Sequence, residues 1–405
     1  MQDTPKTAPG KVSKLVSSLN ESATLAMARM AREKAAAGYD VVSLSLGEPD
    51  FDTPDFIKDA AIDALRKNIT HYPPVNGFLD VREAIAEKFG RDNGLTYNPA
   101  EIIVSTGAKQ CIANAIFAMV DPGDEVILPA PYWVSYAELV RLAGGVVVSV
   151  NAGVERDFKM TAQELEAAIT PKTKLIIYSS PSNPTGSVYS DAELESFASV
   201  ILKHEGIYVI SDEIYEHINF TGAGKSIGTI DGMWDRTITV NGVSKAFAMT
   251  GWRIGYLGAP RWIADACLKM QGQITSGANT IAQMATKAAV MADPQAIQPM
   301  VEVFRQRRDL MHGMLKEIPG MKVNLPEGAF YFFPEISSYF GLSHGNHKIN
   351  SASDLALYLL DTENVAVVSG EAFGGEECIR LSYATSNEKI VEAVNRIARA
   401  LSRLS

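Results

Sequence analysis

The stretch EIIVSTGAKQCIANAIFAMVDPGDEVILPAPYWVSYAELVRLAGGVVVSV (101–150) alternates short apolar runs with longer segments of helical periodicity. Apolar runs bounded by turn residues, which are typical of buried strands, cover 101–106, 125–131 and 145–150. Segments with apolar residues at helical spacing cover 108–120 and 133–143. Because strands that alternate with helices usually pair in parallel, we expect an α/β fold with a mostly parallel sheet and helices on both faces.

The same alternation continues on both sides of this stretch. Further strands are expected at 41–46, 174–180, 206–212 and 237–244. Further helices are expected at 22–37, 55–67, 80–93, 165–169 and 192–204. Residues 255–290 carry one long helical pattern.

The pattern changes after about Pro294. A helix at 297–317 precedes four short strand-like runs, and a closing helix is expected at 387–404. The runs are MKVNLP (321–326), GAFYFFP (328–334), VAVVSG (365–370) and CIRLSYAT (378–385). Since 405 residues are too many for one core, we expect three parts. They are an N-terminal segment 1–53 that joins the small domain, a large domain 54–294 and a small α+β domain 295–405.

Composition excludes several classes of protein. The net charge of −10 argues against a basic nucleic-acid surface. Three cysteines far apart provide neither a disulfide framework nor a zinc motif, and no metal site is expected. No apolar run approaches the ~20 residues that span a bilayer, and MQDTPKTAPGKVSKLV (1–16) lacks the features of a signal peptide. We therefore expect a cytoplasmic protein, with a removed organelle transit peptide as the open alternative.

Four polar motifs lie at the ends of predicted strands or directly after them. They are STGAK (105–109), SSPSNPTG (179–186), SDEIY (211–215) and SKAFAMTGWR (244–253). In open sheets of this kind, ligands bind beyond the carboxyl ends of the strands. The four motifs are therefore expected to meet at one site.

Each motif has an ordinary explanation when taken alone, but together they indicate one cofactor. The N–H groups of 107–109 suit an anion, or merely begin a helix. Asn183 lies on a loop stiffened by prolines, Asp212 places a charge at the end of an apolar strand, and Lys245 follows another strand. Arg253 suits a phosphate. A phosphate cradle, a Schiff-base lysine and an acid for a pyridine nitrogen are the set that pyridoxal 5'-phosphate (PLP) requires.

The chain resembles the class I aminotransferases of PLP fold type I along nearly its whole length. The resemblance rests on LGEPDFDTP, HYPPVNGFLDVREAIA, STGAKQ, DPGDEVILPAPYWVSY, SPSNPTG, SDEIYEH, SKAFAMTGWRIGY, EGAFY and IRLSYATS. Within that family it is most similar to subgroup Ib, which contains bacterial-type aspartate aminotransferases and prephenate aminotransferases. A homodimer with shared active sites is implied.

The resemblance implies a role for each residue around the cofactor ring. Lys245 would form the Schiff base and move the proton, and Asp212 would keep the pyridine nitrogen protonated. Asn183 and Tyr215 would bond the ring oxygen, and Trp133 would stack on the ring. Lys245 and Asp212 are thus the expected catalytic residues.

The phosphate site is implied in the same way. Its expected members are Gly107, Ala108, Lys109, Ser244, Arg253 and, from the other subunit, Tyr72. One position departs from the family, because many relatives have serine where this chain has Gly242. Ser244 is expected to supply the missing contact.

For the substrate, the resemblance implies that Arg380 binds the α-carboxylate, helped by the backbone of Gly47. Trp133 and Asn183 would also contact the substrate. The distal carboxylate would meet Lys109, Thr24 and Ser22. Glu21 stands where relatives have proline and is expected to face solvent, and Tyr331 is expected to reach the substrate.

We therefore expect an aspartate:2-oxoglutarate aminotransferase, an enzyme that acts on amino acids and 2-oxo acids. Two alternatives share the same fold: a glutamate/aspartate-prephenate aminotransferase, and a PLP-dependent C–S lyase. A non-catalytic effector-binding module would need an attached DNA-binding domain, for which the residues before Ser22 leave no room.

Overall fold

The computed structural model describes residues 12–17, 19–222 and 224–405, so residues 1–11 of the expected N-terminal segment lie outside the described residues. Its largest sheet has seven strands in the order β2-β8-β7-β6-β5-β3-β4. The strands are β2 Ile102–Ser105, β3 Glu125–Ala130, β4 Val146–Asn151, β5 Thr173–Ser179, β6 Tyr208–Asp212, β7 Thr237–Gly242 and β8 Gly255–Gly258. All pair in parallel except β8, which runs antiparallel to both β2 and β7. The mostly parallel sheet is confirmed.

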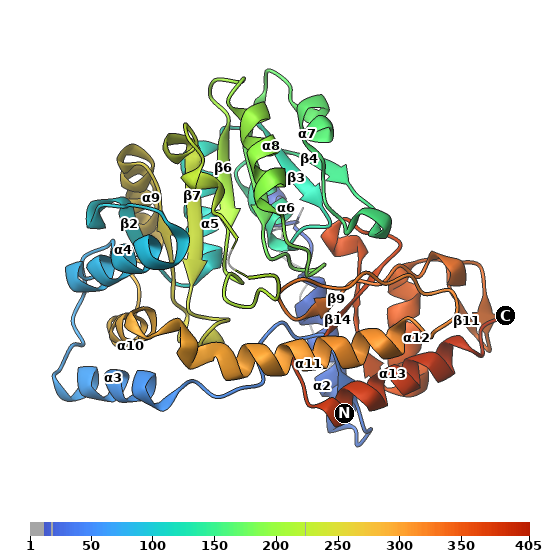
Figure 1. Ribbon diagram of the computed structural model, residues 1–405. Helices are drawn as coiled ribbons and strands as arrows, with labels where there is room; N and C mark the ends of the chain where they lie inside the picture. Colours follow the sequence, from blue (N-terminus) through green and yellow to red (C-terminus); the bar gives the residue numbers. More distant parts are fainter. Residues whose placement is uncertain (1–11, 18, 223) are drawn as a thin grey trace.

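Helices cover both faces of this sheet (Figure 1). One buried cluster joins the sheet to helices α5, α6 and α9, and others join it to α3, α4 and α10 and to α7 and α8. The helices are α3 Asp55–Arg66, α4 Leu79–Asn93, α5 Ala108–Met119, α6 Ser135–Leu142, α7 Ala162–Ala168, α8 Asp191–Ile201, α9 Arg261–Ile274 and α10 Thr280–Met291. Central strands such as β5 are buried almost throughout, which explains their continuous apolar sequences.

A second group of elements packs beside the first around its own apolar cluster. It contains a three-stranded sheet in the order β13-β14-β9 and a parallel pair of β1 with β12. Its elements are α2 Ala23–Ala36, β1 Val42–Ser43, α11 Gln298–Leu315, β9 Tyr331–Phe332, α12 Ala352–Glu363, β12 Val365–Ala366, β13 Val368–Ser369, β14 Ile379–Ser382 and α13 Asn387–Leu401. The pairing of β1 with β12 brings the N-terminal segment into this group.

Three short elements complete the set of α-helices and strands in the described residues: α1 Lys14–Ser17, β10 Ser343–His344 and β11 His347–Lys348. None of the helices in the described part of the chain combines the length and the apolar character that a membrane crossing needs.

Three details of the predicted elements were wrong. The helical pattern at 255–290 begins with strand β8, and it is broken again at Ser276 and Gly277, which both have positive φ. A Cβ on Gly255 would lie 2.2 Å from the Ala108 nitrogen, so glycine lets this strand approach helix α5 closely. The run at 321–326 forms only an isolated bridge between Lys322 and Glu335, and helix α12 was not predicted.

Candidate active site

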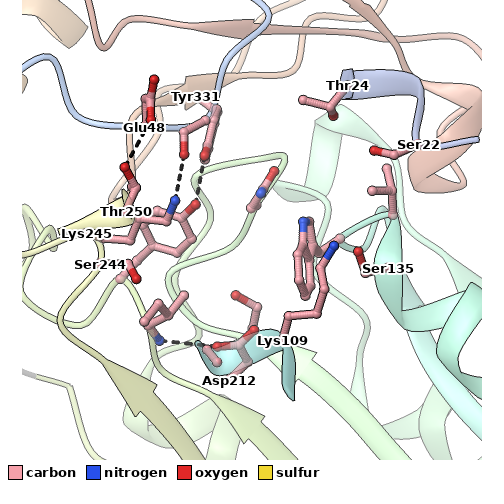
Figure 2. Close-up of a pocket in the computed structure, with 18 of the residues that line it drawn as sticks. Ser22, Thr24, Glu48, Lys109, Ser135, Asp212, Ser244, Lys245, Thr250 and Tyr331 are labelled. Atoms are coloured by element: carbon pink, nitrogen blue, oxygen red, sulfur yellow. Dashed lines mark hydrogen bonds between the residues drawn. The ribbon is translucent and has the colours of Figure 1, made fainter. Parts of the chain in front are cut away.

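A cavity of about 370 Å³ lies between the large sheet and the second group of elements. It opens at the carboxyl ends of β5, β6 and β7, because Ser179, Asp212 and Ser244 at or just beyond those ends line it (Figure 2). Of the residues predicted for the site, fourteen line the cavity: Ser22, Thr24, Gly47, Ala108, Lys109, Trp133, Asn183, Asp212, Tyr215, Ser244, Lys245, Arg253, Tyr331 and Arg380. The structure thus gathers residues that lie up to 358 positions apart in the chain, from Ser22 to Arg380.

Two predicted residues do not line the cavity. Gly107 lies directly behind it, with a positive φ of 86°, and a Cβ there would come within 2.5 Å of an Arg253 nitrogen. Glycine is therefore required for the guanidinium to approach the N-terminus of α5. The Tyr72 side chain is 93% exposed and lies outside the cavity, so its contact with a second subunit stays a prediction.

Asp212 ends strand β6 and is buried. The Tyr136 hydroxyl donates a 2.6 Å hydrogen bond to its Oδ2, and the Ile214 N–H donates one of 3.3 Å to Oδ1. Burial raises the pKa of the Asp212 carboxyl to about 6, although these two hydrogen bonds act to lower it. A carboxylate in this position gains by facing a protonated ligand nitrogen, because the ion pair would offset the loss of hydration.

Lys245 follows strand β7 and points into the cavity, where its Nζ donates a 2.6 Å hydrogen bond to the Gly47 carbonyl (Figure 2). Burial of the ammonium, followed by repulsion from Arg380, lowers the pKa of Lys245 to about 8. The neutral amine is therefore far more populated near neutral pH than it is in an ordinary exposed lysine, although the ammonium remains the major form. Neutral amines are the reactive form of lysine, both as nucleophile and as base.

Arg380 lies in β14 and is only 2% exposed. Its Nη1 donates to Asn183 Oδ1 at 3.0 Å and its Nη2 to the Ser45 carbonyl at 2.7 Å, while its buried Nε has no partner. Among the described residues no carboxylate lies within ion-pair distance of it. A buried guanidinium without an anion is costly, so this arrangement suits a carboxylate supplied by a ligand.

A second place that suits an anion lies beside helix α5. Arg253 has a left-handed backbone conformation and donates from Nη1 to the Thr250 carbonyl at 2.9 Å. Lys109 lies on the first turn of α5, with its Nζ 5.0 Å from the center of the Trp133 ring. Burial and the nearby Arg253 lower the pKa of Lys109. Two cations at a helix N-terminus make this end of the cavity suitable for an anion.

The two departures from the expected family pattern have structural explanations. A Cβ on Gly242 would lie 3.1 Å from Gly255 Cα, so the paired strand β8 leaves little room for a serine there. Ser244 lines the cavity instead. Glu21 faces solvent, as predicted, and its carboxylate lies 3.5 Å from the Arg29 guanidinium on the surface.

Sequence reasoning missed several residues that line the cavity, and Tyr136 is the one among them whose side chain contacts a predicted catalytic residue. Tyr136 lies on the predicted helix 133–143, and its helical spacing could have placed it against the sheet, but nothing local indicated its bond to Asp212. Tyr331, which was expected to reach the substrate, lines the cavity. Its hydroxyl lies 2.7 Å from that of Tyr215, and a Cβ on Gly47 would lie only 2.5 Å from it.

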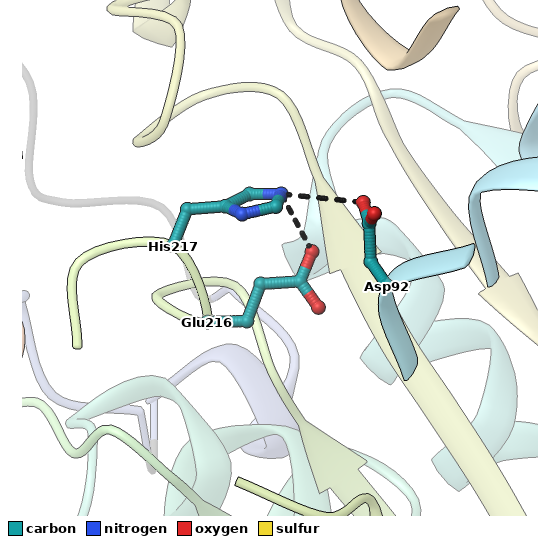
Figure 3. A group of neighbouring side chains, drawn as sticks. All are labelled: Asp92, Glu216 and His217. Atoms are coloured by element: carbon teal, nitrogen blue, oxygen red, sulfur yellow. Dashed lines mark ion pairs between the residues drawn. The ribbon is translucent and has the colours of Figure 1, made fainter. Parts of the chain in front are cut away.

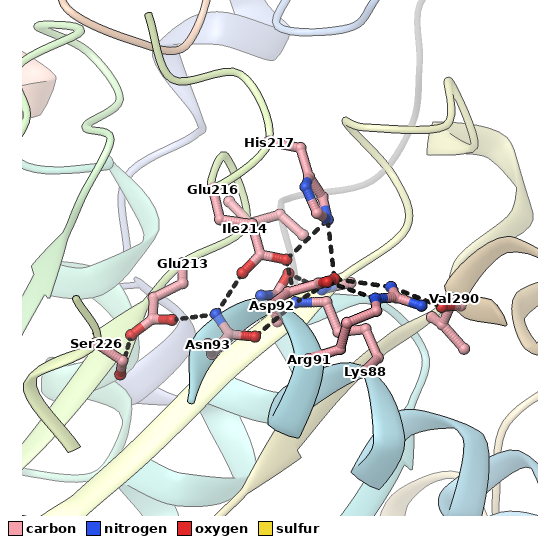
Figure 4. A network of polar contacts seen from close by, with 12 residues as sticks. Lys88, Arg91, Asp92, Asn93, Glu213, Ile214, Glu216, His217, Ser226 and Val290 are labelled. Atoms are coloured by element: carbon pink, nitrogen blue, oxygen red, sulfur yellow. Dashed lines mark hydrogen bonds and ion pairs between the residues drawn. The ribbon is translucent and has the colours of Figure 1, made fainter. Parts of the chain in front are cut away.

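A second polar cluster, also missed, lies apart from the cavity. Asp92, Glu216 and His217 place their ligand atoms within 4.8 Å of one another, a spacing that could hold a metal ion (Figure 3). The Lys88 ammonium, however, bonds to Glu216 and lies 3.6 Å from Asp92 (Figure 4). Burial opposes ionisation of Glu216, but Lys88 and His217 outweigh it and lower the pKa of that carboxyl. Lys88 and Arg91 thus already pair with the two carboxylates of the cluster.

Known proteins resemble this chain along nearly its whole length. The sequence model described as aminotransferase class I and II matches residues 39–397. A bifunctional aspartate aminotransferase and glutamate/aspartate-prephenate aminotransferase from Petunia hybrida is 47% identical over 95% of this chain and 82% of its own. An aspartate/prephenate aminotransferase from Cereibacter sphaeroides is 48% identical over 95% and 97%. The crystal structure of the aspartate aminotransferase from Rhizobium meliloti superposes with a TM-score of 0.94 at 42% identity, covering 98% of this chain and all of its own.

Proposed function

The chain belongs to the class I and II aminotransferases, and we propose that it transfers an amino group between aspartate and 2-oxoglutarate with PLP as cofactor. The observation that carries the proposal is the joint placement of Asp212, Lys245 and Arg380 in one cavity. An acid for a ring nitrogen, an amine with a lowered pKa and an unpaired guanidinium are the groups that transamination of an amino acid requires.

The cavity fits PLP in its size and its charges. Asp212 would face the pyridine nitrogen, because burial raises the pKa of its carboxyl and a positive charge beside it would offset that cost. Arg253, Ser244 and the first N–H groups of α5 would hold the phosphate, and Trp133 would cover one face of the ring. When bound, PLP supplies the electron sink that stabilises negative charge at the substrate Cα.

The residues of the chain divide the remaining work. Lys245 would take the proton from Cα of the donor amino acid and hand it to the cofactor, and it would later move a proton from the cofactor to Cα of the product amino acid, for which its pKa of about 8 is well placed. Arg380 would bind the α-carboxylate as a two-pronged donor, turned toward it by Asn183. Asp212 would hold the proton on the ring nitrogen, with its own orientation set by Tyr136.

Lys109, Thr24 and Ser22 would select substrates that have an acidic side chain. Lys109 has no ion-pair partner in the part of the chain that the structure describes, and the Ser22 hydroxyl makes no capping bond to helix α2. Both groups line the cavity and are free to bind a distal carboxylate. Prephenate also carries a second carboxylate, and relatives named for aspartate and prephenate support an aspartate/prephenate aminotransferase as the alternative function.

We also propose a homodimer with shared sites and a division into domains. The exposed Tyr72 would reach the phosphate of a second subunit, where its hydroxyl could donate a hydrogen bond. The large domain would extend over 54–294 and the small domain over 295–405. Residues 1–53 would join the small domain, in agreement with the pairing of β1 with β12.

The proposed function is tested with the protein loaded with PLP. Aspartate and 2-oxoglutarate are supplied together, and oxaloacetate is measured through its reduction by malate dehydrogenase. We expect oxaloacetate to form, and glutamate to donate its amino group to prephenate if the alternative also applies. Absence of amino transfer from both aspartate and glutamate would refute the proposal.

A further inference from the structure

The segment 45–53 connects the two groups of elements and contacts two functional side chains, Arg380 and Lys245. The Ser45 carbonyl accepts from Arg380, and the Gly47 carbonyl accepts from Lys245. On the side of the large sheet, Glu48 accepts from the Thr250 hydroxyl at 3.0 Å, and Thr53 donates to the Ala248 carbonyl at 2.8 Å. The position of this short segment therefore affects where two functional side chains lie.

One partly buried ion pair attaches the segment to the second group of elements. Arg307 in helix α11 donates from Nη1 and Nη2 to the two carboxylate oxygens of Asp50, at 2.6 and 2.8 Å. The Arg307 and Asp50 side chains are 10% and 30% exposed. Two parallel bonds to one carboxylate fix both the distance and the angle between the partners, which a single bond does not.

The surroundings of Arg307 favour this one orientation. Its guanidinium lies 5.3 Å from the ring center of Phe51 and 5.8 Å from that of Phe304. Those two rings pack edge to face at 5.4 Å, and Phe304 belongs to the apolar cluster of the second group. The pair thus couples the segment to the same core from which Arg380 emerges.

We propose that Asp50 and Arg307 are positioning residues for the substrate α-carboxylate. By holding the segment 45–53 against helix α11, the pair keeps the Ser45 and Gly47 backbone at the correct distance from Arg380. The effect falls mainly on substrate binding, because β6 and the end of β7 in the other group fix the backbone of Asp212 and Lys245. Only the terminal ammonium of Lys245 bonds to the segment, whereas Arg380 emerges from the core to which the ion pair attaches it. The inference rests on the proposed function, in which Arg380 binds that carboxylate.

The test uses the PLP-loaded protein and the variant Arg307→Lys, which keeps the charge but loses the second parallel bond. We expect KM for aspartate to rise about tenfold while kcat changes less than about threefold. The affinity for succinate, a dicarboxylate with no amino group, measured by calorimetry, should fall by a similar factor. The visible absorbance of the bound cofactor should stay unchanged.

Controls separate positioning from a loss of stability. Glu302→Gln breaks an exposed ion pair with Arg305 on the same helix and should leave both constants unchanged. Asp50→Asn tests the same contact if Arg307→Lys fails to fold. The double variant should lose no more substrate affinity than the more impaired of the two single variants, because both substitutions remove the same interaction.

The outcomes distinguish the inference from the function on which it rests. If aspartate is a substrate of the parent protein but KM and succinate affinity in Arg307→Lys stay within about twofold, the pair is structural and the inference is overturned. A fall in melting temperature alone would have the same meaning. If the parent protein itself fails to use aspartate, the proposed function has failed first.

Discussion

The Lys245 ammonium donates a 2.6 Å hydrogen bond to the carbonyl oxygen of Gly47, 198 residues earlier in the chain. The bond holds the amine close to the Arg380 guanidinium, which is itself bonded to the neighbouring backbone at Ser45. The amine and the guanidinium are thus positioned by one short segment. A bond to a neutral carbonyl does not compensate the ammonium's charge, so burial still lowers the pKa of Lys245.

Replacement of Asp212 by asparagine should separate stability from function. Because burial raises the pKa of the folded carboxyl to about 6 from 3.8, the charged form destabilises the cofactor-free protein above pH 6. Asp212→Asn should therefore raise its unfolding free energy at pH 7.5, by about 2 kcal/mol. The gain should shrink as the pH falls from 6 toward 4, because the native carboxyl then becomes neutral. Denaturant unfolding at several pH values measures this difference.

The same Asp212→Asn variant should lose at least about a hundredfold in kcat when it is loaded with PLP. Asparagine cannot stabilise a positive charge on the ring nitrogen. Asp235→Asn, which changes an exposed side chain, serves as the control and should alter neither stability nor turnover. Full activity in Asp212→Asn would mean that the carboxylate does not face the ring.

Removal of the Tyr136 hydroxyl should change the pH dependence of the reaction. The hydroxyl donates to Asp212 and helps to lower the pKa of that carboxyl. In Tyr136→Phe the pKa should rise, so the acidic limb of the kcat/KM profile should move to higher pH by about one unit. An unchanged profile, measured with aspartate between pH 5 and 9, would show that Asp212 does not govern the acidic limb.

The substitution Arg380→Ala should weaken every amino-acid substrate. A buried guanidinium that meets a carboxylate with two bonds contributes several kcal/mol, so kcat/KM should fall at least about a hundredfold. The loss should be alike for aspartate, glutamate and phenylalanine, since all share the α-carboxylate. A variant that lost activity only with dicarboxylates would place Arg380 at the other end of the substrate.

Lys109→Met should instead affect acidic substrates selectively. The Lys109 ammonium has no ion-pair partner among the described residues, so it is available to bind the distal carboxylate of a substrate. We expect kcat/KM for aspartate to fall about tenfold, or about 1.4 kcal/mol, with phenylalanine changed much less. Equal losses for both substrates would remove Lys109 as a specificity residue.

Most of the site could be predicted because it lies at the ends of parallel strands. The motifs at 105–109, 179–186, 211–215 and 244–253 each follow an apolar run, and parallel pairing brings their carboxyl ends to one edge. Strand β8 escaped prediction because it is four residues long, begins and ends with glycine, and runs directly into a helix. Its identity as a strand depends on pairing with β2 and β7, which is not a local property.

Contacts between distant segments had no signal in the sequence. Asp50 and Arg307 are separated by 257 residues, and nothing in either neighbourhood indicates the other. The bond from Tyr136 to Asp212 and the pairing of Lys88 with Glu216 are of the same kind. Such pairs arise from how whole helices are packed on the sheet, so only the structure shows them.

The central claim is that Lys245, Asp212 and Arg380 carry out amino transfer on acidic amino acids. It is tested most directly by mixing the PLP-loaded protein with a single amino acid and following the cofactor absorbance by stopped flow. We predict that aspartate and glutamate each convert the cofactor rapidly to pyridoxamine phosphate, and that Lys245→Ala does not. A bound cofactor that aspartate and glutamate leave unchanged would contradict the account.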